Sequence, residues 1–249
     1  MKRRILSLLL VLTLLLALPV AVAAAGTKEV TLTLTKDTWT YTDTVTFSVK
    51  GPDGEAVPNG EVEVRSSMDH VFCYVNKGVA EIPASVLVSR LELTLGQETV
   101  ISVNYGPGSG SDYAPKSGQT SITVNESTLP TVALTSTGYA YGAPVSGFSV
   151  KSATEHVSAG EVSIENDTDT TFGEKAYKVR LQLTTEKGYS LAPDAVVTLD
   201  SKTGTPVGDG YYEFQLDELY PTYTITYKLN DGKLSNAPAQ YNKNSGAIT

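Results

Sequence analysis

The sequence predicts an all-β protein built from two tandem β-sandwiches behind an N-terminal signal peptide. Three observations point to this fold class. Charged residues are only 18%, and the abundance of Thr, Ser, Val and Gly suits half-buried strands joined by turns. Short runs alternate apolar and polar residues with a period of two. Finally, an ordered series of residues recurs after 100 positions, and a chain of 249 residues has room for two domains.

Residues 1–25 carry the features of a signal peptide. Basic residues near the start precede a leucine-rich apolar run, and small residues end that run, which is the pattern that a signal peptidase reads. We expect cleavage after Ala23 or Ala25, export from the cell, and no membrane span in the mature chain. An uncleaved anchor is the alternative, because the run is just long enough to cross a bilayer, but Pro19 disfavours it.

The first domain is expected at residues 27–126, where about seven short runs alternate with period two. Turn-forming pairs such as Asn59-Gly60 and Pro107-Gly108 separate the runs. Short alternating strands at this spacing indicate a β-sandwich. Residues 85–95 fit neither the strand period nor the helix period. The runs cover residues 30–35, 45–49, 61–65, 70–75, 79–82, 99–105 and 120–124.

The alternation also predicts which side chains form the core of this first domain. The inward set comprises Leu34, Phe47, Val62, Ile101 and Val103. In the run at 70–75, one face carries Val71, Cys73 and Val75. We therefore expect the single cysteine to be buried and not to act as a reactive thiol.

A comparison of the chain with itself indicates two related halves. The matches come in order, and Phe47 to Lys50 recurs at 148–151 after a slip of one residue. The second domain is thus expected at residues 130–221, behind a polar link at 125–130 whose Pro130 disfavours a continuous strand. Residues 222–249 are expected to be an incomplete β repeat or a flexible tail. The matched residues are Leu34 and Leu134, Tyr41 and Tyr141, Val45 and Val145, and Gly60-Glu61-Val62 and Gly160-Glu161-Val162.

Several segments together resemble a known family. The strand at 60–64, the run at 99–105, a glycine-rich loop, Tyr113-Ala114-Pro115 and a closing Ile122-Thr123-Val124 resemble bacterial immunoglobulin-like repeats of the group 3 type. This resemblance implies tandem immunoglobulin-like β-sandwiches in an extracellular, multi-repeat surface protein, and it transfers no catalytic residue.

Two shorter segments of the second half resemble other repeats of secreted proteins. The strand at 177–183 followed by Lys187-Gly188-Tyr189 looks like a signature of repeat domains in secreted Firmicutes proteins. The segment at 223–230 is similar to the opening of a Listeria-Bacteroides type repeat. Both resemblances imply an extracellular protein.

Charge and composition exclude several classes of function. The chain holds 19 basic and 27 acidic residues, so its net charge of −8 repels nucleic acid and anionic lipid. One cysteine and two histidines exclude a disulfide framework, a zinc cage of Cys and His, and most catalytic triads. We expect no cofactor and no metal.

The candidates for catalysis or metal binding are few. Glu61 and Glu63 lie two residues apart on one strand face, about 7 Å from each other, but alternating glutamates are also what a solvated sheet face requires. His70 and His156 stand in polar segments without a recognised nucleophile beside them. The acidic loop that holds Asp167 and Asp169 could supply calcium ligands, although an acidic turn is the simpler interpretation. We therefore expect no enzymatic activity.

The tyrosine content suggests a contact surface. Fourteen tyrosines stand against five phenylalanines, and core packing accounts for most of them. The remainder favours a carbohydrate-binding or protein-binding surface. The aromatic residues of interest are Trp39, Tyr41, Tyr139 and Tyr141 in the two halves, and Tyr211, Tyr212, Tyr220 and Tyr223 near the end.

These observations predict a monomeric, non-catalytic module on the cell surface, serving as the stalk or spacer of a longer surface protein or in adhesion. Its partners would be a cell-wall, host or glycan surface. The alternative is a carbohydrate-binding accessory module of a secreted enzyme, with Tyr211, Tyr212 and Tyr223 as its aromatic platform.

Overall fold

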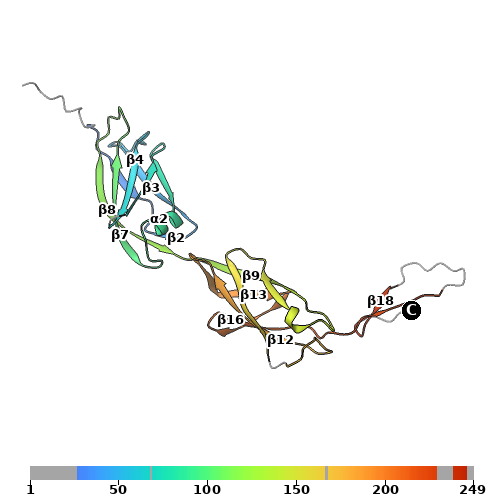
Figure 1. Ribbon diagram of the computed structural model, residues 1–249. Coiled ribbons are helices and arrows are strands. Elements are labelled where there is room, and N and C mark those ends of the chain that lie inside the picture. The colour runs from blue at the N-terminus through green and yellow to red at the C-terminus, as the bar shows by residue number, and fades with distance from the viewer. Residues whose placement is uncertain (1–26, 68, 166–167, 229–237, 246–249) are drawn as a thin grey trace, which may run out of the picture. The chain divides into compact units, whose positions relative to one another are not determined.

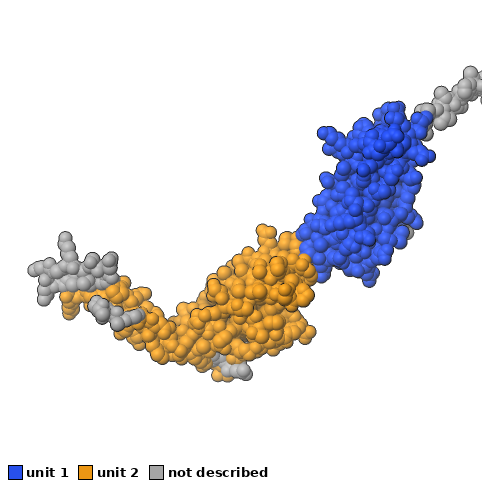
Figure 2. Space-filling view, turned by 180° about the vertical axis from the view of Figure 1, so that it is seen from behind, with its two compact units in different colours: residues 1–127 blue, residues 128–249 orange. Residues whose placement is uncertain are grey.

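The computed structural model describes residues 27–67, 69–165, 168–228 and 238–245. These residues form several small β-sheets and one short α-helix (Figure 1). The chain divides into two compact units, residues 1–127 and 128–249 (Figure 2). The leader expected at residues 1–25 lies outside the described residues, so the expectation of cleavage stays a prediction.

Unit 1 contains two sheets. The smaller is antiparallel, in the order β1-β3-β6, and the larger has the order β2-β8-β7-β4-β5. All neighbours in the larger sheet are antiparallel except β2 and β8, which are parallel. The strands are β1 (Thr31–Leu34), β2 (Thr38–Thr40), β3 (Thr44–Lys50), β4 (Glu61–Ser66), β5 (Asp69–Tyr74), β6 (Val79–Pro83), β7 (Glu98–Gly106) and β8 (Lys116–Asn125).

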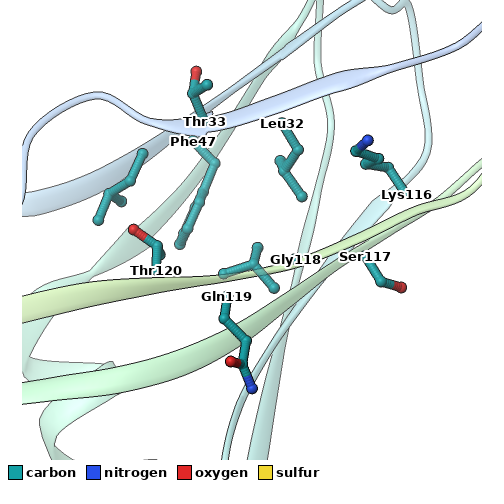
Figure 3. Close-up of a pocket in the computed structure, with 10 residues that line it drawn as sticks. Leu32, Thr33, Phe47, Lys116, Ser117, Gly118, Gln119 and Thr120 are labelled. Carbon is teal, nitrogen blue, oxygen red and sulfur yellow. The ribbon is translucent and has the colours of Figure 1, made fainter.

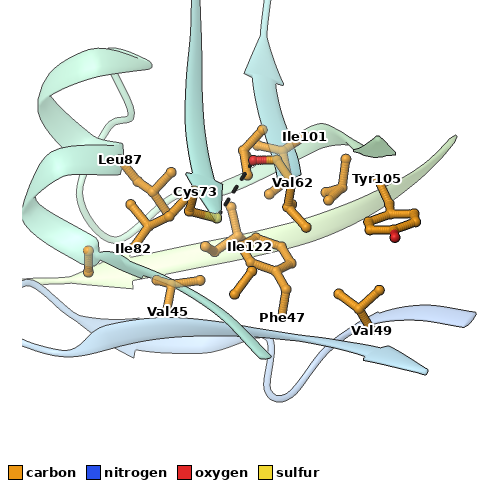
Figure 4. Close-up of a cluster of buried hydrophobic side chains, with 14 of the residues drawn as sticks. Val45, Phe47, Val49, Val62, Cys73, Ile82, Leu87, Ile101, Tyr105 and Ile122 are labelled. Carbon is orange, nitrogen blue, oxygen red and sulfur yellow. Dashed lines mark hydrogen bonds between the residues drawn. The ribbon is translucent and has the colours of Figure 1, made fainter. Parts of the chain in front are cut away.

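The core of unit 1 lies between these two sheets. Side chains of β3 alternate between buried and exposed, because successive residues of a strand point to opposite faces. Figure 4 shows Val45, Phe47 and Val49 facing side chains of the larger sheet. The predicted inward set is confirmed: Phe47, Val62, Ile101 and Val103 are buried, and Leu34 packs against the same cluster.

The stretch at 85–95 that fitted neither period contains helix α2 (Ala84–Arg90). Ala84, Leu87 and Val88 are buried, and Leu91 follows in the same helical spacing. Beyond the helix the chain turns, and Leu93 is also buried. Two turns of helix followed by a turn are too short to show a period, which explains the mixed pattern.

The junction between the units differs from the expected link. One residue separates the end of β8 from strand β9 (Ser127–Thr137), which includes Pro130. The expectation that Pro130 interrupts the strand is therefore wrong. On the side of β10 (Ser149–Ser152) the proline removes no hydrogen bond, because β9 pairs with β10 only from Leu134 onward.

Unit 2 also places a hydrophobic core between two sheets, in the orders β10-β9-β13-β14 and β11-β12-β16-β15. Its strand β12 buries Val179, Leu181 and Leu183 on one face, as the alternation predicts. The remaining elements are β11 (Val157–Ile164), β12 (Lys178–Thr185), β13 (Tyr189–Leu199), β14 (Lys202–Thr203), β15 (Thr205–Gly208), β16 (Tyr211–Gln215) and the short 3-10 helix η1 (Val145–Gly147).

The end of the chain forms a small separate sheet. β17 (Tyr223–Thr224) pairs with β18 (Gln240–Tyr241) in antiparallel register. Parts of the segment expected to be an incomplete repeat or tail, residues 229–237 and 246–249, lie outside the described residues.

The repeat found in the sequence corresponds to similar elements at the start of each unit. Leu34 lies in a strand paired antiparallel with β3, and Leu134 lies in a strand paired antiparallel with β10. Val62 and Val162 both lie in the next long strand, which belongs to the other sheet. Beyond that point the strand orders differ, in keeping with the loss of sequence similarity there.

Candidate functional site

The first and last segments of unit 1 run side by side in the same direction. β2 pairs in parallel with the end of β8, and a second parallel bridge joins Lys28 to Tyr113. The Thr42 N–H donates to the Ser127 hydroxyl at 3.1 Å, and the two hydroxyls share a hydrogen bond of 2.9 Å. The partners are the same number of residues apart in both parallel contacts, so the two contacts keep the same register.

Backbone hydrogen bonds close this pairing at both ends of β2. The Thr123 N–H donates to the Asp37 carbonyl oxygen at 2.8 Å. The Tyr41 N–H donates to the Asn125 carbonyl oxygen at 2.9 Å. The segment that begins unit 1 is therefore bonded to the strand that ends it.

Between these contacts β1 leaves the neighbourhood of β8 and pairs with β3 instead, which opens a groove of about 280 Å³ (Figure 3). Leu32 and Leu34 of β1 form one wall, and Phe47 and Val103 contribute apolar surface. Gly118 leaves further room, because a Cβ at that position would meet nothing within 4 Å. The groove is thus a consequence of the change of sheet between β1 and β2.

A second feature is the outer face of the larger sheet at its β4 and β5 edge. Phe72 is 50% exposed and Tyr74 is 82% exposed, both on β5, the edge strand. The His70 ring stands edge-on to Phe72 with a centroid distance of 5.0 Å. The cross-strand partners are Arg65 for His70, Glu63 for Phe72 and Glu61 for Tyr74. An aromatic row therefore borders a charged row.

A hydrogen-bond network fixes Glu63 in the middle of this face. Asn104 donates from Nδ2 to Oε2 of Glu63 at 3.0 Å, and Arg65 donates from Nε to Oε1 at 2.8 Å. The Asn104 hydrogen bond, followed by that of Arg65, lowers the pKa of Glu63. A general acid needs a raised pKa, so Glu63 lacks the property that an acid of a glycosidase requires.

Two shallow hollows adjoin this face and share Glu61 and Gly106. Tyr74 lines the first, of about 460 Å³, and Phe72 lines the second, of about 340 Å³. Gly106 keeps the shared floor open, since a Cβ there would meet only the Glu61 carbonyl oxygen at 4.0 Å. Within the described part of the chain, no side chain or backbone N–H donates to the half-buried Glu61 carboxylate.

The two histidines lie in different units, both at the surface. His70 is exposed beside Phe72, as described above. In unit 2, His156 stacks on Tyr189 at a centroid distance of 3.8 Å, and its Nδ1 lies 2.9 Å from Oε2 of Glu186.

Cys73 is buried in the core of unit 1, as the alternation predicts. Its thiol donates to the Val62 carbonyl oxygen at 3.6 Å (Figure 4). Burial, and secondarily the negative charge of Glu61, raises the pKa of Cys73 to about 12. A thiol of this kind stays protonated and packs as a small apolar side chain.

The acidic loop is only partly described, because Asp167 lies outside the described residues. Asp169 forms an ion pair of 2.7 Å with Lys175, and the Tyr177 hydroxyl lies 3.5 Å from its carboxylate. Across residues 27–67, 69–165, 168–228 and 238–245, no group of three His, Cys, Asp or Glu side chains is placed to hold a metal ion.

The tyrosines predicted to form a platform do not share one surface. Tyr212 is buried in the core of unit 2, because it points to the opposite face from Tyr211, which lies under the Arg180 guanidinium at 4.6 Å. Tyr223 pairs with Tyr241 in the small terminal sheet. The proposed trio of Tyr211, Tyr212 and Tyr223 is therefore wrong as a binding platform.

Most of the other aromatic side chains singled out in the sequence pack against the hydrophobic cores of the two units. Trp39 is buried and Tyr41 is half-buried against the core of unit 1. Tyr139 packs edge-on against Phe172 at 5.1 Å, whereas Tyr141 is 45% exposed. Sequence reasoning missed the exposed rings of Phe72 and Tyr74, although the alternation that buries Cys73 turns its neighbours outward.

No helix in the described part of the chain is long and apolar enough to cross a membrane. Comparison with protein-family models finds no matching family, and comparison with curated proteins finds no related sequence.

Proposed function

We propose that this chain is a non-catalytic, extracellular structural module that acts as a load-bearing spacer of a surface protein. The observation that carries the proposal is the parallel pairing of β2 with β8, which bonds the beginning of unit 1 to its end.

The strand orders of unit 1 support an immunoglobulin-like sandwich. In such domains the first, second and fifth strands belong to one sheet, and the third, sixth and seventh belong to the other. When β2 is counted as an addition to the first strand, β1, β3 and β6 are the first, second and fifth strands, and β4, β7 and β8 are the third, sixth and seventh. The fourth strand, β5, departs from the constant-type pattern, because it lies at the edge of the second sheet and not in the first. The family resemblance of the sequence and the layout of strands thus favour the same fold.

The parallel pairing determines how unit 1 responds to tension. The chain enters unit 1 before β2 and leaves after β8, and the two strands run in the same direction. A force applied between residues 27 and 127 therefore slides them past each other along their length. Their hydrogen bonds share the load and break together, although each contributes only about 0.5–1.5 kcal/mol to stability.

The exit from unit 1 is short and bonded. One residue, Glu126, separates β8 from β9. On either side, the Asn125 carbonyl oxygen accepts the hydrogen bond from Tyr41, and the Ser127 hydroxyl contacts Thr42. Tension that arrives through β9 acts at once on the paired segment.

The remaining parts of the proposal rest on the chemistry of the side chains. The leader pattern at residues 1–25 supports export, and one buried cysteine suits an oxidising compartment because it leaves no thiol to mispair. Glu63 with a lowered pKa and surface histidines in separate units support a non-catalytic role.

Single-molecule pulling of the mature chain from its two ends tests the proposal. Tyr41→Pro removes the N–H that donates to Asn125, and we expect a lower unfolding force for unit 1 and an unchanged force for unit 2. Ser127→Ala is a milder second variant, because it keeps the backbone and removes only the Ser127 hydroxyl, which bonds the N–H and the hydroxyl of Thr42. An unchanged force for unit 1 in both variants would contradict the load-bearing role.

A further inference from the structure

The edge strand β5 exposes two large rings where a sheet usually exposes polar side chains. Phe72 and Tyr74 lie two residues apart on the outer face, so their attachment points are about 7 Å apart along the strand. Exposed apolar side chains at a sheet edge are costly, because they promote association, and gathered ones often mark a binding site. Each ring lines its own hollow.

In the part of the chain that the structure describes, two hydrogen-bond acceptors line the hollows without a donor of their own: the Glu61 carboxylate and the amide oxygen of Asn104. Among the described residues, the Glu61 carboxylate receives no hydrogen bond, although it is half-buried between both hollows. Asn104 uses its Nδ2 on Glu63, which leaves the amide oxygen of Asn104 as an acceptor. A ligand with hydrogen-bond donors would satisfy both acceptors.

The shape of the surface restricts the ligand further. Gly106 forms the shared floor, and glycine within a strand often marks a place where a ligand approaches the backbone closely. Two adjacent hollows, each with one aromatic wall, suit a chain of repeating units. The ligand must therefore combine apolar faces, hydroxyl donors and a repeat.

We propose that this face of unit 1 binds a neutral polysaccharide, with two neighbouring sugar rings against Phe72 and Tyr74 and a hydroxyl group donating to Glu61. Sugar rings have an apolar face of C–H groups and a rim of hydroxyls, which match the rings and the acceptors. The net charge of −8 disfavours an anionic polymer. Arg65 is paired with Glu63 at 2.8 Å, so the charge left on this face is that of the single carboxylate of Glu61.

Affinity electrophoresis of the mature chain tests the proposal, with hydroxyethylcellulose, soluble starch or galactomannan in the gel. We expect at least one of these neutral polymers to retard the protein. Joint replacement Phe72→Ala and Tyr74→Ala should weaken the affinity about tenfold or more, since each aromatic contact contributes roughly 1 kcal/mol. Tyr141→Ala, at an exposed tyrosine of unit 2, is the matched control and should change nothing.

Two further variants separate a sugar from a cationic ligand and a lost contact from a lost fold. Glu61→Gln keeps an acceptor oxygen and should retain most of the affinity for a neutral polymer. Gly106→Thr removes no ligand-binding group but places a side chain on the floor shared by the two hollows, so the polymer should no longer retard the protein. Cooperative thermal unfolding of this variant would show that the fold is kept.

The proposal is overturned if none of the three polymers retards the protein, or if the double alanine variant binds as the wild type does. Retardation by polylysine alone, lost in Glu61→Gln, would identify a cationic partner and also overturn it. The result is independent of the spacer role, because the pulling experiment does not involve these side chains.

Discussion

Phe47→Ala is the sharpest test of the core described for unit 1. Phe47 is fully buried in the middle of β3, where it stands opposite Leu34 on one side and Ala80 on the other. Its ring also lines the groove between β1 and β8. Removing it takes apolar surface out of the centre of the contact between the two sheets.

The expected loss follows from that burial. Replacing a buried phenylalanine by alanine costs about 3–5 kcal/mol, made up of lost transfer free energy and a residual cavity. Because Phe47 lines the groove, neighbouring side chains or water can partly fill the cavity left by the ring from that side. We therefore expect a loss of unfolding free energy near the lower end of this range. With a denaturant slope of about 1 kcal/mol per molar urea, the midpoint should fall by about 3 M.

The protein carries its own probe for this measurement. Trp39 is the only tryptophan of the chain, and it is buried in unit 1 with its indole N–H donating to the Lys36 carbonyl oxygen at 3.1 Å. Its fluorescence in a urea titration therefore reports the unfolding of unit 1, whereas tyrosine fluorescence and circular dichroism also follow unit 2.

Phe148 supplies the matched control, because it is the repeat counterpart of Phe47 but is only half-buried. Phe148→Ala should cost distinctly less free energy, and it should leave the Trp39 transition unchanged. A loss below about 1 kcal/mol for Phe47→Ala would refute the strand phase and the core assigned to β3.

Three further predictions concern titration and metal binding. Since the pKa of Cys73 is raised to about 12, Ellman's reagent at pH 8 should react with this thiol only after unfolding, and rapid reaction of the native protein would contradict its burial. The stability that the protonated thiol contributes should be complete below the pKa of the unfolded thiol and should be lost as pH rises through the folded pKa. Glu63, whose pKa is lowered, should contribute stability that is present above its unfolded pKa of about 4.3 and is lost as pH falls through the folded pKa. Carboxyl NMR titration should show a higher pKa for Glu63 in Asn104→Ala than in the wild type, and an equal pKa in the two proteins would count against the hydrogen-bond network. Calorimetry should detect no submillimolar calcium binding, and binding that disappears on Asp169→Ala would overturn this expectation.

The strand pattern of unit 1 could be predicted because one face of each strand is buried. Alternation in β3 and β4 identifies Phe47 and Val62 as inward, and both side chains are buried. β2 was missed because three residues, Thr38–Thr40, are too few to display a period. Helix α2 was missed for the same reason, since two turns give only one repeat of the helical spacing.

The candidate surfaces depend on long-range pairing and were harder to predict. The contact of Tyr41 with Asn125, and the opposition of Glu61 to Tyr74 and Gly106, arise from strand order, which the local sequence does not specify. The tyrosine platform failed because the sequence could not fix which of Tyr211 and Tyr212 points inward. The outward direction of Tyr74 was missed as well, although it could have been derived from the predicted burial of its neighbour Cys73.

The central claim is that unit 1 bears load through the sliding of β2 against β8, and pulling one protein in two directions tests it most directly. Handles at Thr27→Cys and Glu126→Cys load the parallel pair along its length, whereas handles at Gln97→Cys and Glu126→Cys pull β8 away from β7 at the end where Glu98 lies opposite Thr123. Cys73 does not compete for the handles because it is buried and protonated. The account predicts a several-fold higher unfolding force for the first pair of handles; equal forces in the two directions would contradict it.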